Sequence, residues 1–115
     1  MSPAQTIIRK ALLTAEMEGG RRVDRVEIKQ IDFAPGQQTG LHLHASPVVG
    51  YVARGSVLFQ VDGEPPRTLK EGDAFYEPAE TKILHFDNAS HRDPLTFIAF
   101  YLLRDDDREL ITMLD

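Results

Sequence analysis

The chain has 115 residues, a formal net charge of −5 and no cysteine. This length suits a single domain with one core, and the 42% apolar content is typical of globular proteins. The lack of cysteine excludes disulfides, thiolate catalysis and zinc–thiolate sites. The negative charge and the scattered basic residues argue against a nucleic-acid partner.

The N-terminal segment, residues 1–24, carries its apolar residues in short pairs. Ile7-Ile8 and Leu12-Leu13 are separated by Arg9-Lys10, so no secretory signal is indicated. No apolar run in the chain approaches the roughly 20 residues that span a bilayer. We therefore expect a cytoplasmic protein with no membrane partner. The segment itself fits either a capped helix that stops at Gly19-Gly20 or a strand exchanged within a dimer.

Residues 25–104 read as short strands separated by turn signals at the spacing of a β-sandwich or barrel. The first strand begins near Val26, and its apolar phase shifts at Ile31, which suggests a bulge. We expect a C-terminal tail, residues 105–115, to pack on this barrel. The strands predicted with the clearest pattern span residues 48–53, 56–61, 74–77, 83–86 and 95–103.

A His-x-His pair is the strongest chemical signal in the sequence. Residues two apart in a strand project to the same face, so His42 and His44 present two imidazoles on one side. Their Cα atoms would lie roughly 7 Å apart. A metal bound about 2 Å from each ring nitrogen fits between such rings when they converge.

The spacing around this pair resembles the cupin superfamily. Its first motif has a glycine, five residues, His-x-His, a glutamate and a later glycine. Its second motif begins with a glycine, five residues and a proline. The resemblance implies an all-β cupin-type jelly-roll β-barrel, or double-stranded β-helix, that binds a small molecule. The residues that carry it are Gly36, His42, His44, Gly55, Gly72 and Pro78.

Several ligand positions of these motifs are changed. Val48 stands where the resemblance places a glutamate ligand, and Glu80 replaces the glycine that follows Pro78. Ile83 stands where the second motif has its histidine. If the loop after Pro78 is two residues longer than usual, His85 takes that position instead. The metal ligands expected are His42, His44 and His85, holding Zn, Fe, Mn, Ni or Cu; a site without metal is the alternative.

Two functions follow from this site. The favoured one is a small cupin that binds an organic molecule beside a partial metal site. The alternative is a metal-dependent enzyme of the dioxygenase or isomerase type, acting on a small polar or aromatic substrate. Glu77 and Glu80 near the barrel mouth could donate a carboxylate, but a solvated rim is the simpler expectation for both. The residues expected to line the ligand pocket are Gln38, Val48, Tyr51, Phe59, Tyr76 and Ile83.

A homodimer is also expected. The strand at 96–103 carries apolar groups on both faces, whereas a barrel strand in a monomer buries only one. Residues 7–13 and 110–114 are candidates to cover the outer face within one chain. The cupin resemblance points to pairing through such sheets, and a two-fold interface is the commonest oligomeric arrangement.

Overall fold

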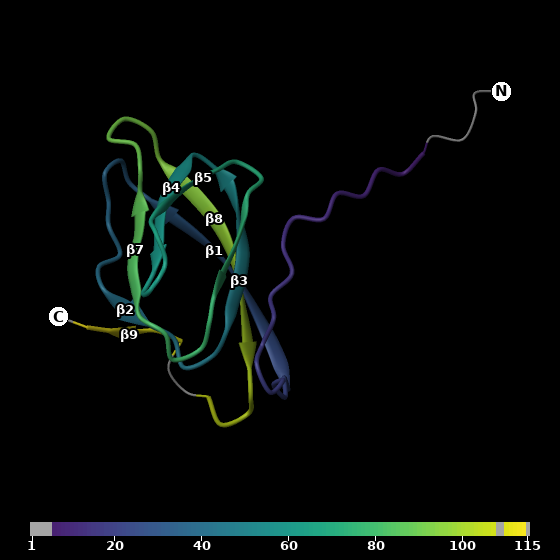
Figure 1. Cartoon of the computed structure of the whole chain (residues 1–115). Coiled ribbons are helices and arrows are strands. Elements are labelled where there is room, and N and C mark those ends of the chain that lie inside the picture. The colour runs from purple at the N-terminus through teal and green to yellow at the C-terminus, as the bar shows by residue number, and fades with distance from the viewer. Residues whose placement is uncertain (1–5, 108–109, 115) are drawn as a thin grey trace.

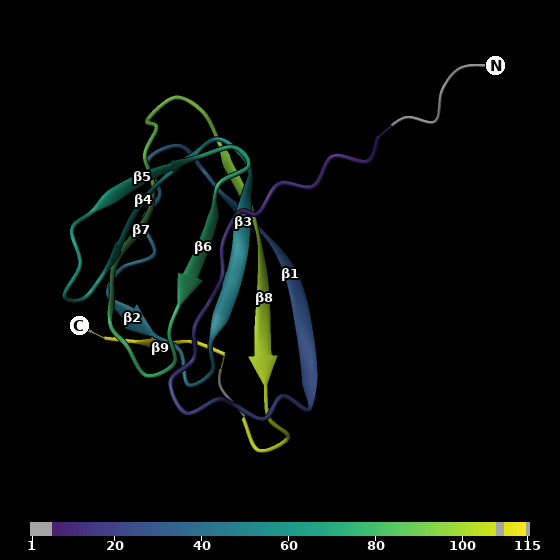
Figure 2. The same cartoon turned by 45° about the vertical axis from the view of Figure 1, so that its right-hand side comes forward.

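The computed structural model describes residues 6–107 and 110–114, and all regular structure in this part is β-strand. Two antiparallel sheets face each other in a jelly roll (Figures 1 and 2). The four-stranded sheet runs in the order β1 (Arg25–Phe33), β8 (Leu95–Leu103), β3 (Val48–Arg54) and β6 (Ala74–Glu77). The five-stranded sheet runs in the order β5 (Arg67–Lys70), β4 (Ser56–Val61), β7 (Ile83–Asn88), β2 (His42–Leu43) and β9 (Thr112–Met113). The predicted all-β fold is confirmed.

Strand β8 forms the middle of the four-stranded sheet, between β1 and β3. Its buried residues alternate with half-buried ones along its whole length, as the period of two requires. The half-buried outer positions include Ile98 and Phe100, so both faces of this strand are apolar. Its limits coincide with the strand predicted at 95–103.

The bulge predicted in the first strand is wrong. Strand β1 pairs with β8 in one unbroken register, from Arg25 opposite Leu103 to Phe33 opposite Leu95. The apolar residues change from even to odd positions along the strand because both of its faces carry apolar side chains. Ile28 lies on the outer face and is 63% exposed, whereas Phe33 packs on the inner face against the core.

Phenylalanine rings fill much of the space between the sheets. The ring of Phe86 lies 4.5 Å from that of Phe97 and 5.0 Å from that of Phe75, centroid to centroid. Gly50 makes room for this packing, because a Cβ there would lie 2.6 Å from the Phe75 ring and 2.1 Å from the carbonyl oxygen of Ile98. We name this group the aromatic cluster; its members are Phe59, Phe75, Phe86 and Phe97.

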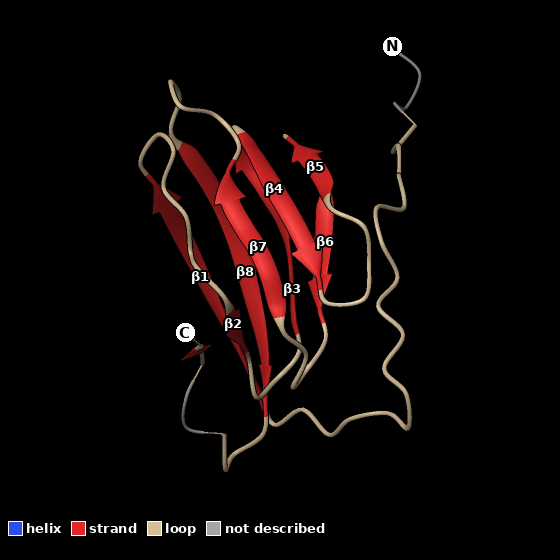
Figure 3. Ribbon diagram, turned by 60° about the vertical axis from the view of Figure 1, so that its left-hand side comes forward, coloured by secondary structure: helices blue, strands red, loops and turns tan. Residues whose placement is uncertain are grey.

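No helix or strand lies within residues 6–24 of the single chain, and a strand exchanged within a dimer stays a prediction. The segment runs along the outside of the four-stranded sheet and then away from the body of the molecule (Figures 1–3). Its C-terminal end is fixed by an ion pair of 2.7 Å between Arg21 and Asp107. In the described part of the chain, no helix has the length and apolar character to cross a membrane.

The other end of the chain lies against the site strand. Strand β9 pairs with β2, with Met113 opposite His42. The backbone N–H of Leu114 donates to the carbonyl oxygen of Leu41 at 2.9 Å. This pairing holds residues 110–114 against the sheet that carries the His-x-His pair.

Candidate metal centre

The two histidines of the His-x-His pair project into the interior from β2 and the residue that follows it. The relative exposure of His42 is 2% and that of His44 is 4%. Their ring centroids lie 5.0 Å apart at an interplanar angle of 81°. The short strand is held on both sides, by β7 opposite Ile83 and by β9 opposite Met113. The predicted projection of the two imidazoles to one side is therefore present, and the structure adds that the rings converge.

The third group is the carboxylate of Glu77, at the end of β6. Phe75 and Glu77 are the two buried positions of this strand, so the period of two turns the carboxylate inward. Glu77 is 4% exposed, and the expectation that it belongs to a solvated rim is wrong. It lies directly opposite Val48 in the β3–β6 register. The strand partner of Val48 thus provides the carboxylate that the first motif lacks.

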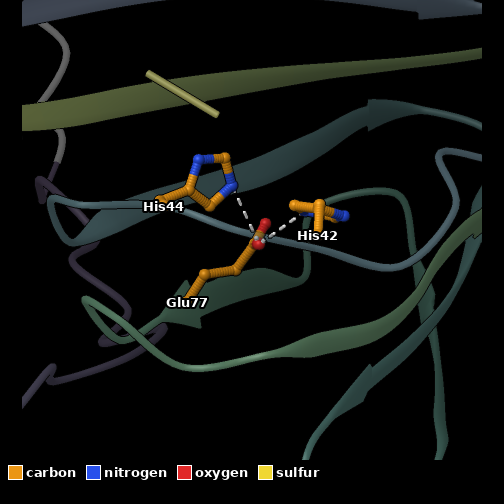
Figure 4. A group of neighbouring side chains, drawn as sticks. All are labelled: His42, His44 and Glu77. Carbon is orange, nitrogen blue, oxygen red and sulfur yellow. Dashed lines mark hydrogen bonds and ion pairs between the residues drawn. The ribbon is translucent and has the colours of Figure 1, made fainter. Parts of the chain in front are cut away.

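The three side chains meet at one carboxylate oxygen (Figure 4). Oε2 of Glu77 lies 3.3 Å from Nε2 of His42 and 3.2 Å from Nε2 of His44. One ligand atom from each residue lies within 4.8 Å of the other two. Bonds of about 2.1 Å at angles of 90° to 109° would separate neighbouring ligand atoms by roughly 3.0 to 3.4 Å. Both separations from the carboxylate oxygen lie in this range, as expected for ligands of one shared cation.

The other ring nitrogen of each histidine is already hydrogen-bonded to a backbone carbonyl. Nδ1 of His42 bonds the carbonyl oxygen of Gly40 at 2.9 Å, and Nδ1 of His44 bonds that of Leu110. A carbonyl oxygen only accepts, so Nδ1–H donates in both rings and Nε2 of the neutral ring carries a lone pair. Such outer hydrogen bonds orient histidines that ligate metals. Two imidazole lone pairs and a carboxylate, which also only accepts, need protons or a cation between them.

The pKa shifts show how the group behaves when protons fill this role. Burial alone lowers the pKa of His44, but the hydrogen bond to Glu77, its negative charge and the carbonyl of Leu110 outweigh burial and raise that pKa above 6.5. Burial alone raises the pKa of Glu77, but contacts with both imidazoles lower it below 4.5. A negative carboxylate and a positive imidazolium are therefore the charge state favoured without metal.

A cavity of about 130 Å³ lies beside the triad. His42, His44 and Glu77 form part of its wall, and apolar side chains from both sheets form most of the remainder. Tyr101 also lines it, and burial, followed by the charges of Glu77 and Glu27, raises the pKa of its hydroxyl. The arrangement places one polar corner in an otherwise apolar cavity.

Comparison with known proteins decides the family. A family model described as "Cupin domain" matches residues 30–101, more than half of the chain. The chain belongs to the cupin family. A search of curated proteins finds no match. The match includes the His-x-His pair and Glu77, so the triad lies inside the cupin domain.

Solved structures show the same fold. An oxalate oxidase in complex with the substrate analogue glycolate aligns with a TM-score of 0.65 and 21% identity, covering 77% of this chain and 46% of its own. A DMSP lyase from Ruegeria pomeroyi aligns with a TM-score of 0.62 and 20% identity, covering 78% of this chain and 43% of its own. A cupin-like protein from Thermotoga maritima aligns with a TM-score of 0.63 and 26% identity, covering 77% of this chain and 64% of its own. This cupin thus spans less than half the length of the two enzymes.

His85 lies away from the triad. The β4–β7 register shifts after Gln60, which pairs with His85, while the next residue, Val61, pairs with Ile83. This bulge turns His85 outward although Ile83, two residues earlier, is buried. The His85 side chain is 46% exposed, and its Nδ1 lies 2.8 Å from Oδ2 of Asp87. The structure therefore does not bring His85 to the metal site.

Of the six residues expected to line the pocket, Val48 lies in the cavity wall and the other five do not. Tyr51 and Tyr76 lie at the outer-face positions of β3 and β6, because they have the opposite parity to Val48 and Glu77. Phe59 and Ile83 point inward but are fully packed in the core. Gln38 is exposed and forms a bridge with Asp87. Strand parity thus removes most of these residues from the cavity.

Proposed function

We propose that this cupin holds a divalent transition metal on His42, His44 and Glu77 and acts as a metal-dependent enzyme on a small organic molecule bound beside it. The observation that supports this most is the convergence of three ligand atoms within 4.8 Å, two of them on rings already oriented by carbonyls. Two histidines and one carboxylate with open positions are the donor set of non-haem iron(II) oxygenases. Zinc, manganese, nickel and copper are the other candidates.

The carboxylate of Glu77 supports the enzyme hypothesis over the simple binder, because it offers a third ligand atom beside the two imidazoles. A bare pair of histidines leaves most coordination positions to water, whereas three protein ligands fix a metal and still leave it open to substrate. A metal at such a site supplies Lewis-acid activation of a bound oxygen group. The chain's own residues orient the ligands, and the apolar cavity wall excludes water from the bound molecule.

Metal analysis of protein purified without a His-tag or added metal tests this function. His42→Ala should lose at least about tenfold in metal affinity, and the protein should remain folded. His85→Ala is the matched control, since it removes an exposed imidazole outside the triad and should leave the metal-to-protein ratio unchanged. An equal ratio in wild type and His42→Ala, or equal losses in the two variants, would overturn the metal site.

We also propose that two copies of the chain pair. Ile8 is 90% exposed on the N-terminal segment, and Ile28 is 63% exposed on the outer face of β1. The N-terminal segment leads away from the two sheets of its own chain (Figure 3). A second copy can therefore cover both the segment and the outer face of β1. Light scattering coupled to size exclusion should give about twice the 12.9 kDa of one chain. Ile8→Ser should shift the mass towards one chain and Thr6→Ser should not; a wild-type mass of one chain would refute pairing.

A further inference from the structure

We infer that the cavity beside the triad takes a small monocarboxylate of up to about six carbon atoms in all, with an apolar body. The inference rests on the metal site proposed above and specifies the class of molecule that occupies it. Three properties of the cavity lead to it: the charge of the triad with its cation, the polar partners in the wall, and the size of the space.

Charge selects a monoanion. A divalent cation held by one carboxylate and two neutral imidazoles keeps one net positive charge in the interior. The triad residues are at most 4% exposed, so solvent screens this charge poorly. A net charge buried in apolar surroundings is unfavourable unless it is paired. One carboxylate on the ligand neutralises the site, and a second one would make it negative.

The described wall provides no cationic side chain as a partner for a second carboxylate. Among the residues that the structure describes, no Lys or Arg side chain lines the cavity. Lys29 instead lies over the ring of Tyr101, 5.9 Å from its centroid. The hydroxyl of Thr39 already donates to the carbonyl oxygen of Phe86 at 2.6 Å. A distal carboxylate would therefore face apolar side chains without a counter-ion.

Size and lining determine the rest of the molecule. A dry cavity of roughly 150 Å³ lined by Leu, Ile and Phe binds benzene. The 130 Å³ here is slightly smaller. Phe33, Phe86 and Phe97 contribute aromatic wall, and Phe33 packs edge-on against Phe97 at 5.4 Å between centroids. A short aliphatic chain or a small ring fits this space, whereas an eight-carbon chain exceeds it.

Titration of cobalt(II)-loaded protein with three acids tests the inference, with the visible absorption of cobalt as the readout. Butanoate and succinate share four carbon atoms and differ in the second carboxylate; octanoate shares the single carboxylate but is longer. We expect butanoate to bind at least 10-fold more tightly than either of the others. Succinate binding as tightly as butanoate would overturn the charge argument, and octanoate binding as tightly would overturn the size argument.

Two cavity variants distinguish the cavity from the metal site. Ala99 lies in the wall and is 1% exposed, so Ala99→Leu fills the space and should weaken butanoate at least 10-fold at unchanged cobalt stoichiometry. Phe33→Ala widens the cavity and should bring octanoate within threefold of butanoate. Ile98→Leu, on the outer face of the same strand, is the control and should change neither ligand.

Cobalt stoichiometry is measured before any acid is added, which separates the two possible failures. If cobalt binds but butanoate binds no more tightly than succinate and octanoate, the proposed ligand class is wrong and the metal site stands. Absence of cobalt binding would overturn the metal site and the ligand class together. Unchanged butanoate affinity in a folded Ala99→Leu protein would show that the acid binds outside this cavity.

Discussion

The aromatic cluster and the triad occupy the same interior, and Phe86 and Phe97 of the cluster line the cavity beside the triad, yet the two groups are built on opposite principles. In the aromatic cluster, rings pack at centroid distances of 4.5 to 6.0 Å and leave no polar group to satisfy. In the triad, three groups with lone pairs meet within 4.8 Å. Packing of the first kind stabilises a fold, whereas convergence of the second kind costs stability until a proton or cation neutralises it.

The comparison teaches that the cluster fixes the frame in which the triad is held. Phe75 and Glu77 lie two residues apart on β6 and face the same interior. The ring is anchored among other rings, so the strand has little freedom to turn the carboxylate outward. We therefore expect changes in the cluster to alter folding and changes in the triad to alter metal binding.

The largest effect should come from Phe75→Ala. This ring is fully buried, and its removal should lower the free energy of unfolding by about 3–5 kcal/mol. Urea denaturation measures the loss. Phe100→Ala removes the same side chain from the half-buried outer face of β8 and should cost clearly less. Equal losses in the two variants would contradict the central role of the cluster.

A swap across the β3–β6 pair should change metal affinity and leave the cluster intact. Glu77→Val should weaken binding about 100-fold or more, because it leaves two imidazoles alone. Adding Val48→Glu to Glu77→Val should recover affinity to within about tenfold of wild type, since the two positions are strand partners. Competition with a metal-sensitive dye measures both. A double variant as weak as Glu77→Val would show that position 48 cannot present a carboxylate to the imidazoles.

The pH dependence should differ between the metal-free and the metal-loaded protein. The pKa of His44 is raised, so its contact with Glu77 stabilises the metal-free fold below pH 6.5 and is lost as the pH rises through the raised pKa. The pKa of Glu77 is lowered, so its contribution is present above pH 4.5 and is lost as the pH falls through the lowered pKa. The unfolding temperature of metal-free protein should thus be highest between pH 4.5 and pH 6.5.

Metal binding should follow the opposite trend, because His44 must lose its proton before Nε2 can ligate. Affinity should rise from pH 6 to pH 8 in wild type. In Glu77→Gln the charge that raises the pKa of His44 is absent, so the rise should be complete at a lower pH. A metal-free stability that increases steadily above pH 7 would contradict the charge state assigned to the triad.

The smallest effect concerns the turn after Pro78, which supports the site from outside. Glu80 has a φ of 58°, a left-handed conformation that glycine adopts more readily, and its N–H donates to the carbonyl oxygen of His44 at 2.7 Å. Glu80→Gly should raise the free energy of unfolding by up to ~1 kcal/mol, with metal affinity unchanged. Ala79→Gly, at the neighbouring position, is the control and should destabilise the protein. Thermal unfolding compares the two variants. Stabilisation by both would refute backbone strain at Glu80.

Local pattern was sufficient for β6, which carries Glu77, and for β8, which lines the cavity. The strands at 74–77 and 95–103 were predicted at their observed limits, because a period of two and clear turn signals define them. The same period predicted that His42 and His44 would project to one face, and both belong to the triad. It also contained an unused signal for Glu77, which shares the parity of the apolar Phe75 and so belongs to the interior.

Tertiary structure decided which other residue joins the histidines. The register of β3 against β6 places Glu77 opposite Val48, and a bulge between β4 and β7 turns His85 away. Both depend on pairing between strands that the chain brings together from a distance, and periodicity within one strand does not encode such pairing. The sequence alone therefore determined the fold and two members of the triad, whereas long-range register determined the third, because a shift of one residue exchanges the inner and outer faces of a strand.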